Sequence, residues 1–269
     1  EEFIEIKRVE PNYDIYIEYG NETYAINEKL RMPDVETYID RLRELGQRIK
    51  AIDPKVKIGV PILDYRLERA IFNDPGNYPD GEANWEYTQG IRALTWNAAL
   101  SENSELFDAV IPHMYISADK LRTNQQNYLK NIMKNMQGKV RGTMRQEHQF
   151  PGKEVWVTEY GFFPQALNIG ASGGAYRDME QDGKCLGAAL VDATSVLMLL
   201  DTNASVTSLH YMIDPQGFGI AQFADTERTK LTYLPHYYLY KELGKLFNPV
   251  ISKSGVCHRL EKILEQYND

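Results

Sequence analysis

KEVWVTEYG, residues Lys153–Gly161, is the stretch from which the fold of this chain is predicted. Valines alternate there with a tryptophan and a threonine, a β-branched and aromatic pattern that predicts a short buried strand. The strand delivers a carboxylate, Glu159, at its C-terminal end. A charge in such a place is unfavourable unless it is paired or functional.

A second segment repeats this pattern. Asp14–Glu22, DIYIEYGNE, is predicted to be a strand that runs out at Asn21 and Glu22. Glycosidic bonds are cleaved by two carboxyl groups, one that protonates the leaving oxygen and one that attacks or activates water. Glu22 and Glu159 are candidates for this pair, whereas the alternative is that each glutamate forms an ion pair or caps a helix.

Strand-like and helix-like segments alternate along the chain. Strands are predicted at Tyr13–Tyr19, Val56–Leu63, Asp108–Tyr115, Glu154–Tyr160 and Ser205–Met212. Helices are predicted at 33–52, 85–100, around 129–136, at 185–200 and at 235–247, the fourth nearly all apolar and therefore buried on most sides. Long loops follow strands, at 64–84 and 162–182, and a further loop is expected around 217–219.

This alternation predicts an α/β fold with a parallel sheet, and long loops after strands are typical of a (β/α)8 TIM barrel. About five βα units are visible, so we expect the C-terminal part of a longer barrel. The barrel domain is predicted at residues 1–249, with an appended segment at 250–269.

Composition excludes several classes. The net charge is −8, the pI is near 5.3, and no basic patch with aromatic residues occurs, so nucleic acid is not expected as a partner. No uncharged run approaches the ~20 residues of a membrane span. Glu1-Glu2 has the wrong charge for a signal peptide, but we predict a secreted or periplasmic location. Cys185 and Cys257 fit no metal spacing, and two unpaired thiols are favoured over one bridge.

Two motifs resemble signatures of glycoside hydrolase clan A, the TIM-barrel retaining glycosidases. IEYGNE at Ile17–Glu22 looks like the strand-four motif that carries the acid/base, and WVTEYG at Trp156–Gly161 resembles the strand-seven motif that carries the nucleophile. The resemblance extends from about Tyr13 to Phe247. It implies that the five visible strands are strands four to eight.

The resemblance also implies roles for single residues. Glu22 would be the general acid/base and Glu159 the nucleophile, with no cofactor. Asn21 would bind the sugar 2-hydroxyl. His113 and Tyr115 would bond the nucleophile or the substrate, unless His113 is simply a core histidine.

The chain departs from the clan where many members carry a tryptophan as a sugar platform. His210 and Tyr211 stand there instead. Other aromatic residues that could stack on sugars are Trp85, Tyr78, Phe163 and Phe218. Arginines in the same predicted rim regions, at positions 66, 145 and 177, would suit an acidic or sulfated glycan. On that basis the chain is loosely similar to agarase-like and porphyranase-like members, with a β-galactan as the expected substrate.

Two other classes of function stay open. Glu22, His113, Glu159 and His210 all end predicted strands and could together bind a divalent metal in a barrel hydrolase, although they form no HxH or HExxH motif. The chain could also be a non-catalytic carbohydrate-binding barrel fragment.

Overall fold

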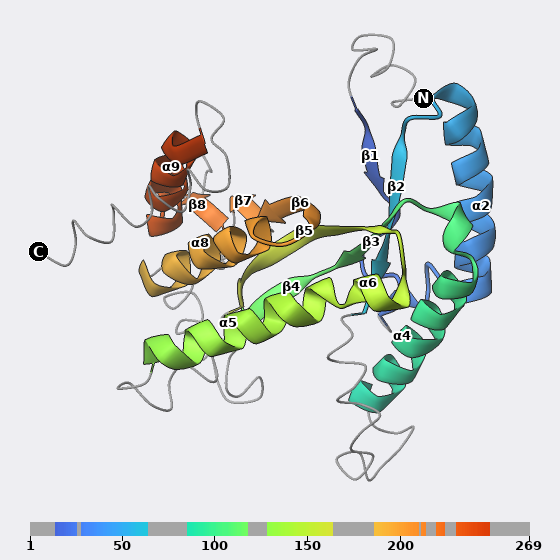
Figure 1. The fold of residues 1–269 in the computed structure, drawn as a ribbon, viewed down its shortest axis with the longest axis horizontal. Helices are drawn as coiled ribbons and strands as arrows, with labels where there is room; N and C mark the ends of the chain where they lie inside the picture. Colours follow the sequence, from blue (N-terminus) through green and yellow to red (C-terminus); the bar gives the residue numbers. More distant parts are fainter. Residues whose placement is uncertain are drawn as a thin grey trace, which may run out of the picture. The chain divides into compact units, whose positions relative to one another are not determined.

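The computed structural model describes residues 14–25, 28–63, 85–117, 128–163, 186–209, 211–213, 219–223 and 230–247 (Figure 1). The chain divides into two compact units. The first consists of residues 1–113, 141–158 and 203–206, and the second of residues 114–140, 159–202 and 207–269. The appended segment predicted at 250–269 and both cysteines lie outside the described residues.

Within the described residues, the main sheet has six strands. Its strands are β1 (Tyr16–Glu18), β2 (Lys57–Ile62), β3 (Ala109–Pro112), β4 (Met114–Ser117), β5 (Glu154–Phe163) and β6 (Ala204–Leu209). The pairs β1–β2, β2–β3, β3–β5 and β4–β5 are parallel, and β6 also pairs with β5. Because β3 and β4 are separated only by His113 and both pair with β5, successive βα units lie next to one another in the sheet, as in a (β/α)8 barrel.

One register shift interrupts the regular pairing. Ala109 pairs with Glu154, an offset of 154 − 109 = 45, whereas Met114 pairs with Tyr160, an offset of 160 − 114 = 46. Strand β5 therefore carries one more residue than the β3–β4 segment between these two points. Extra residues of this kind redirect side chains and occur next to active sites. Glu159 lies within the affected stretch.

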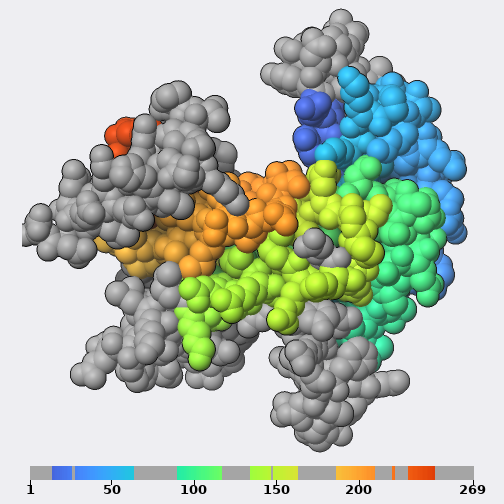
Figure 2. Space-filling view, in the orientation of Figure 1, coloured from blue at the N-terminus to red at the C-terminus, as the bar shows by residue number. Residues whose placement is uncertain are grey.

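Helices connect the strands as predicted. They are α2 (Val35–Ile52), α4 (Trp85–Glu102), the 3-10 turn η4 (Ser104–Leu106), α5 (Tyr128–Met144), α6 (Gln146–Gln149), α8 (Leu186–Leu200) and α9 (Pro235–Phe247). Helix α2 begins after Asp34, whose side chain accepts a hydrogen bond from the Thr37 N–H. It ends at Asp53, before Pro54. Helices α2 and α4 pack side by side on the first unit (Figure 2).

A tryptophan from the motif of the opening stretch fills the core of the first unit. Trp156 is 1% exposed and its ring lies edge-on to Tyr16 at 5.3 Å. The close approach requires Gly59 on β2, because a Cβ there would lie 2.6 Å from the Trp156 ring and 2.7 Å from Ile111. The indole N–H is satisfied by Glu154 at 2.9 Å.

The second unit has its own apolar core. Ile116, Met136, Phe162, Ala188 and Val191 pack together from β4, α5, β5 and α8. The prediction that α8 is buried on most sides is wrong in part. Leu186, Leu190 and Leu200 are exposed, because only one face of the helix packs against the core and α9.

The last predicted strand, 205–212, is divided. Its first part is β6, while β7 (Tyr211–Ile213) belongs to a second sheet with β8 (Gly219–Phe223) and β9 (Leu231–Tyr233). Strand β8 is parallel to β7 and antiparallel to β9. The loop expected around 217–219 therefore leads into strand pairing from Gly219 on. Among the described helices, none combines the length and apolarity needed to cross a membrane.

Candidate active site

Glu22 lies in a turn beyond the first strand. The prediction that the strand continues to Glu22 is wrong, because β1 ends at Glu18 and the main chain bends at Gly20, where φ is +83°. A Cβ at that glycine would lie 2.6 Å from Thr23. Glu22 itself has φ of +41°. This left-handed conformation is uncommon for a residue other than glycine and costs about 1–3 kcal/mol.

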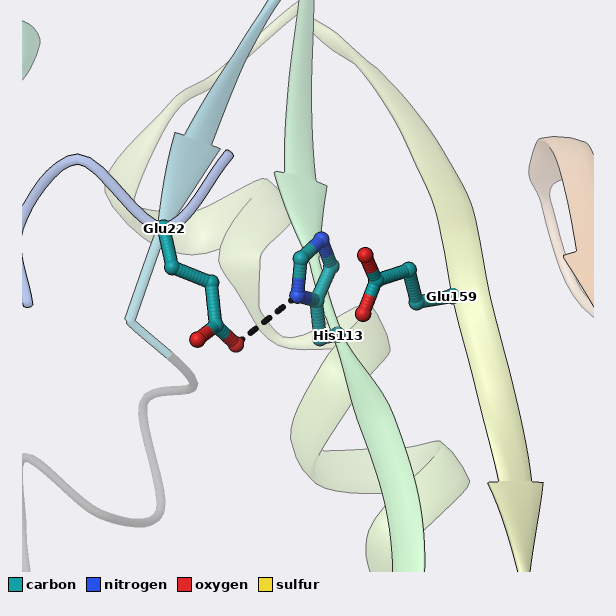
Figure 3. Close-up of side chains that lie close together, drawn as sticks. All are labelled: Glu22, His113 and Glu159. Carbon is teal, nitrogen blue, oxygen red and sulfur yellow. Dashed lines mark hydrogen bonds and ion pairs between the residues drawn. The ribbon is translucent and has the colours of Figure 1, made fainter. Parts of the chain in front are cut away.

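Glu22 faces a buried histidine. The Nδ1 atom of His113 lies 2.9 Å from the Glu22 carboxylate (Figure 3). Its Nε2 atom lies 3.7 Å from the Glu18 carboxylate. The His113 side chain is 3% exposed, whereas that of Glu22 is 40% exposed. The Glu22 side chain is therefore accessible to solvent, while its carboxylate is held by the buried His113 imidazole.

Glu159 is held by a tyrosine within the second unit. The Tyr115 hydroxyl donates a hydrogen bond of 2.6 Å to the Glu159 carboxylate. A hydrogen bond to the charged form favours ionisation. The prediction that Glu159 lies at the end of its strand is wrong, because β5 continues for four more residues to Phe163. These four residues pair with β4.

The residues that contact the two glutamates lie close together in the sequence. His113, which contacts Glu22, and Tyr115, which contacts Glu159, are separated by a single residue. Covalent geometry alone limits the distance between their Cα atoms to about 7 Å. His113 and Tyr115 were both predicted to bond the nucleophile or the substrate. Tyr115 contacts the predicted nucleophile, whereas His113 contacts the predicted acid/base.

The remaining predicted site residues are less informative. Asn21 is exposed in the turn before Glu22. Trp85 is the first residue of α4, Tyr211 the first of β7 and Phe163 the last of β5; the side chains of all three, and the whole of Tyr78, His210 and Phe218, lie outside the described part of the structure.

The predicted arginines do not form a described anion site. Arg145 follows α5 and leads into α6, and α6 precedes the first residue of β5. Arg145 therefore lies near the N-terminal end of β5. The prediction that it belongs to the rim at the C-terminal ends of the strands is wrong. Arg66 and Arg177 lie outside the described residues.

Sequence reasoning missed a buried polar cluster in the second unit. Asp192 of α8 lies 3.2 Å from His236 of α9, and both side chains are at most 2% exposed. Burial raises the pKa of Asp192, opposed by the His236 hydrogen bond. Tyr160 and Tyr240 form a 2.7 Å hydrogen bond nearby, and burial raises the pKa of both. An aspartate in an otherwise apolar helix was the available signal.

Comparisons with known proteins give fold-level likeness to several glycosidases. No family model and no curated protein matches the chain. Among solved structures, an α-L-arabinofuranosidase from Thermotoga maritima is 16% identical, with 83% of this chain and 38% of that chain covered and a TM-score of 0.48. An endo-β-1,4-mannanase from Thermotoga petrophila is 19% identical, covering 88% and 45%, at 0.45. The catalytic core of xylanase A is 12% identical, covering 80% and 56%, at 0.40.

The chain thus spans less than half of the arabinofuranosidase and mannanase chains. Likeness at these identities and TM-scores does not assign an activity, which depends on the residues described above.

Proposed function

We propose that this chain carries the catalytic residues of a retaining glycoside hydrolase acting on a polysaccharide or oligosaccharide. The observation that supports the proposal most directly is that His113 and Tyr115, one residue apart, each hold one of the two predicted catalytic glutamates. Two carboxyl groups about 5–5.5 Å apart give retention, whereas about 6.5–9.5 Å gives inversion. We propose that the carboxyl groups of Glu22 and Glu159 have the shorter separation, which gives retention.

In the first step the Glu159 carboxylate attacks the anomeric carbon and forms a glycosyl–enzyme ester. The glycosidic C–O bond breaks, and the leaving oxygen takes the proton of the Glu22 carboxylic acid. The hydrogen bond from the Tyr115 hydroxyl orients the Glu159 carboxylate before the attack. In the second step Glu22 removes a proton from water, the water oxygen bonds to the carbon, and the Glu159 carboxylate is released.

His113 suits a carboxyl group that changes its protonation state twice. A neutral imidazole nitrogen can accept a hydrogen bond from protonated Glu22, and an N–H can donate to ionised Glu22. A contact of 2.9 Å is compatible with either state. We infer that His113 keeps Glu22 oriented through both steps.

The substrate class is also a proposal. Arabinan, xylan and mannan are tested because the similar structures are named for such sugars, and agarose and porphyran because the arginines of the predicted rim regions suggested a β-galactan. The proposed location is outside the cytoplasm, where such polymers are encountered.

The decisive test is a screen of the purified protein against these five polysaccharides, with the anomeric configuration of the products followed by NMR. Glu159→Gln should remove turnover. Glu22→Gln should lower it by about 10²- to 10⁴-fold, the contribution of a general acid. Azide should restore activity to a Glu22→Ala variant by giving a glycosyl azide of retained configuration, since azide needs no base.

Glu44→Gln is the matched control, because Glu44 is an exposed carboxylate that pairs only weakly with Arg48 on α2 at 3.6 Å. Turnover by Glu159→Gln at the level of this control would refute the nucleophile assignment. Products of inverted configuration would refute retention.

A metal-dependent hydrolase is the second candidate, because Glu22, His113 and Glu159 offer carboxylate and imidazole ligands of the kind that divalent metals bind. The contacts of Glu22 to His113 and of Tyr115 to Glu159 occupy some of those same atoms and favour the glycosidase. Stoichiometric metal in the purified protein, with activity lost on chelation and restored by that metal, would reverse this preference.

A further inference from the structure

The turn that carries Glu22 is anchored on both sides by side chains from helices. On one side, the Tyr38 hydroxyl of α2 donates to the Tyr19 carbonyl at 2.8 Å. On the other side, the Arg92 guanidinium of α4 donates to the Thr23 carbonyl at 3.1 Å. Tyr38 is fully buried and Thr23 is 5% exposed. Glu22 therefore lies between two fixed points of the main chain.

Arg92 makes two more bonds to the same loop. Its Nη1 donates to the Pro33 carbonyl at 2.8 Å, and its Nη2 donates to the Met32 carbonyl at 2.5 Å. One guanidinium thus ties the start of the loop, at Thr23, to its end, immediately before α2. The planar fork of donors suits arginine to such a role, and lysine cannot reproduce it.

The surroundings hold the guanidinium in place. It lies over the Trp96 ring, 4.7 Å from the centroid, one helical turn further along α4. Burial lowers the pKa of Arg92, and the Asp34 carboxylate opposes this effect. Trp96 in turn packs against Tyr38 at 5.1 Å, so the two anchors of the turn share one aromatic support.

Such support is needed because Glu22 adopts a positive φ. A conformation that costs about 1–3 kcal/mol persists only where neighbouring contacts fix it. The bond from Arg92 to the Thr23 carbonyl acts on the residue directly after Glu22.

We propose that Arg92 is a positioning residue for the acid/base, holding the main chain at Thr23 and at Met32–Pro33 so that Glu22 keeps its contact with His113. This inference rests on the proposed glycosidase function for its catalytic meaning. Arg92 is assigned no contact with substrate, so its removal affects the reaction only through the placement of Glu22.

The first test is structural and does not depend on activity. In a crystal structure of Arg92→Met, which keeps an unbranched side chain on Trp96, the Glu22 carboxylate should leave His113 Nδ1, or its density should be lost. Arg92→Lys serves as a second variant that retains the charge if Arg92→Met does not fold. Arg48→Met is the matched control, because Arg48 is 76% exposed and pairs only with Glu44 among the described contacts. An unchanged Glu22–His113 distance in the Arg92 variant overturns the proposal.

The second test separates a positioning effect from general damage. The glycoside that the wild type cleaves is supplied with two leaving groups, phenolate and 2,4-dinitrophenolate. Phenolate departs only with a proton from Glu22, whereas dinitrophenolate departs unaided. For Arg92→Met, kcat/KM on the phenyl glycoside should fall on the order of 10²-fold, the effect of displacing a catalytic group by about 1 Å. With dinitrophenolate it should stay near the wild-type value.

Equal losses on both glycosides would show a general structural role and overturn the positioning role. If the wild type cleaves no glycoside, the proposed function fails, while the crystal structures still decide whether Arg92 holds Glu22 in place.

Discussion

At the scale of single residues, the contact between Tyr115 and Glu159 carries the clearest consequence for the proposed reaction. A hydrogen bond from a neutral donor to a charged acceptor is worth about 1.5–3 kcal/mol. Tyr115→Phe removes the hydroxyl while keeping the ring. We therefore expect kcat/KM to fall roughly 10- to 100-fold, since each 1.4 kcal/mol is a factor of ten.

Steady-state kinetics on the substrate found in the polysaccharide screen would measure this loss. Tyr238→Phe is the control, because Tyr238 is 59% exposed on α9. Activity of Tyr115→Phe equal to that of the control would mean that the hydroxyl does not serve Glu159 in catalysis.

At the residue scale, the sequence allowed predictions where a motif defined the position, but none where the tertiary structure decides. Glu22 and Glu159 were predicted from two motifs and His113 and Tyr115 from the wider resemblance to clan A, and the catalytic roles of all four stay predictions.

The roles of Arg92 and Tyr38 were not predicted, because each contacts a partner far away in the sequence and no local pattern marks it. The Asp192–His236 pair was also missed, because the lone aspartate of an apolar helix does not reveal its partner on another helix.

At the scale of elements, the start of the sheet is crossed by an ion pair with a defined pH dependence. Lys57 of β2 pairs with Glu154 of β5, across the intervening β3. Burial would raise the pKa of Glu154, but hydrogen bonds from Lys57 and Trp156 outweigh it and lower that pKa. The Glu154 bond raises the pKa of Lys57.

A lowered carboxyl pKa stabilises the folded state above the unfolded pKa, and this contribution is lost as the pH falls through the folded pKa. A raised lysine pKa stabilises below the unfolded value and is lost as the pH rises through the folded one. The contribution should therefore be constant between about pH 5 and 10, given ordinary pKa values near 4.3 and 10.4.

Glu154→Gln should lower the free energy of unfolding at pH 7 by at most about 1 kcal/mol, since both groups are partly exposed. The glutamine oxygen still accepts from the Trp156 N–H, so the core contact is preserved. Urea unfolding at several pH values should show the difference from wild type shrinking below about pH 4. A difference that persists at acid pH would place the effect in packing instead.

Most element boundaries followed from the sequence because local signals set them. Asp34 and the Asp53-Pro54 pair bound α2, and Pro235 begins α9, within two residues of the predicted limits. The short β8 and β9 were missed, since their pairing partners determine them and three to five residues carry little pattern. The surplus residue in β5 was missed for the same reason, because register exists only between strands.

At the scale of the whole molecule, net charge distinguishes the candidate substrates. The chain carries −8, so a sulfated galactan such as porphyran is repelled at long range, whereas xylan, mannan and agarose are neutral. If porphyran is the substrate, raising the salt concentration should increase kcat/KM by screening this repulsion. For a neutral glycan the value should stay constant between about 0.01 and 0.15 M salt, and a rise there would contradict the assignment of a neutral substrate.

The turn at Glu22 also bears on how variants of this protein would behave under selection. A left-handed backbone conformation is adopted more easily by glycine and asparagine than by glutamate. At position 22, stability alone would therefore favour glycine or asparagine over the glutamate that the proposed reaction needs. A library screened only for survival after heating would therefore enrich glycine or asparagine at position 22. The most heat-resistant variants would then lack the proposed acid/base and have lost activity.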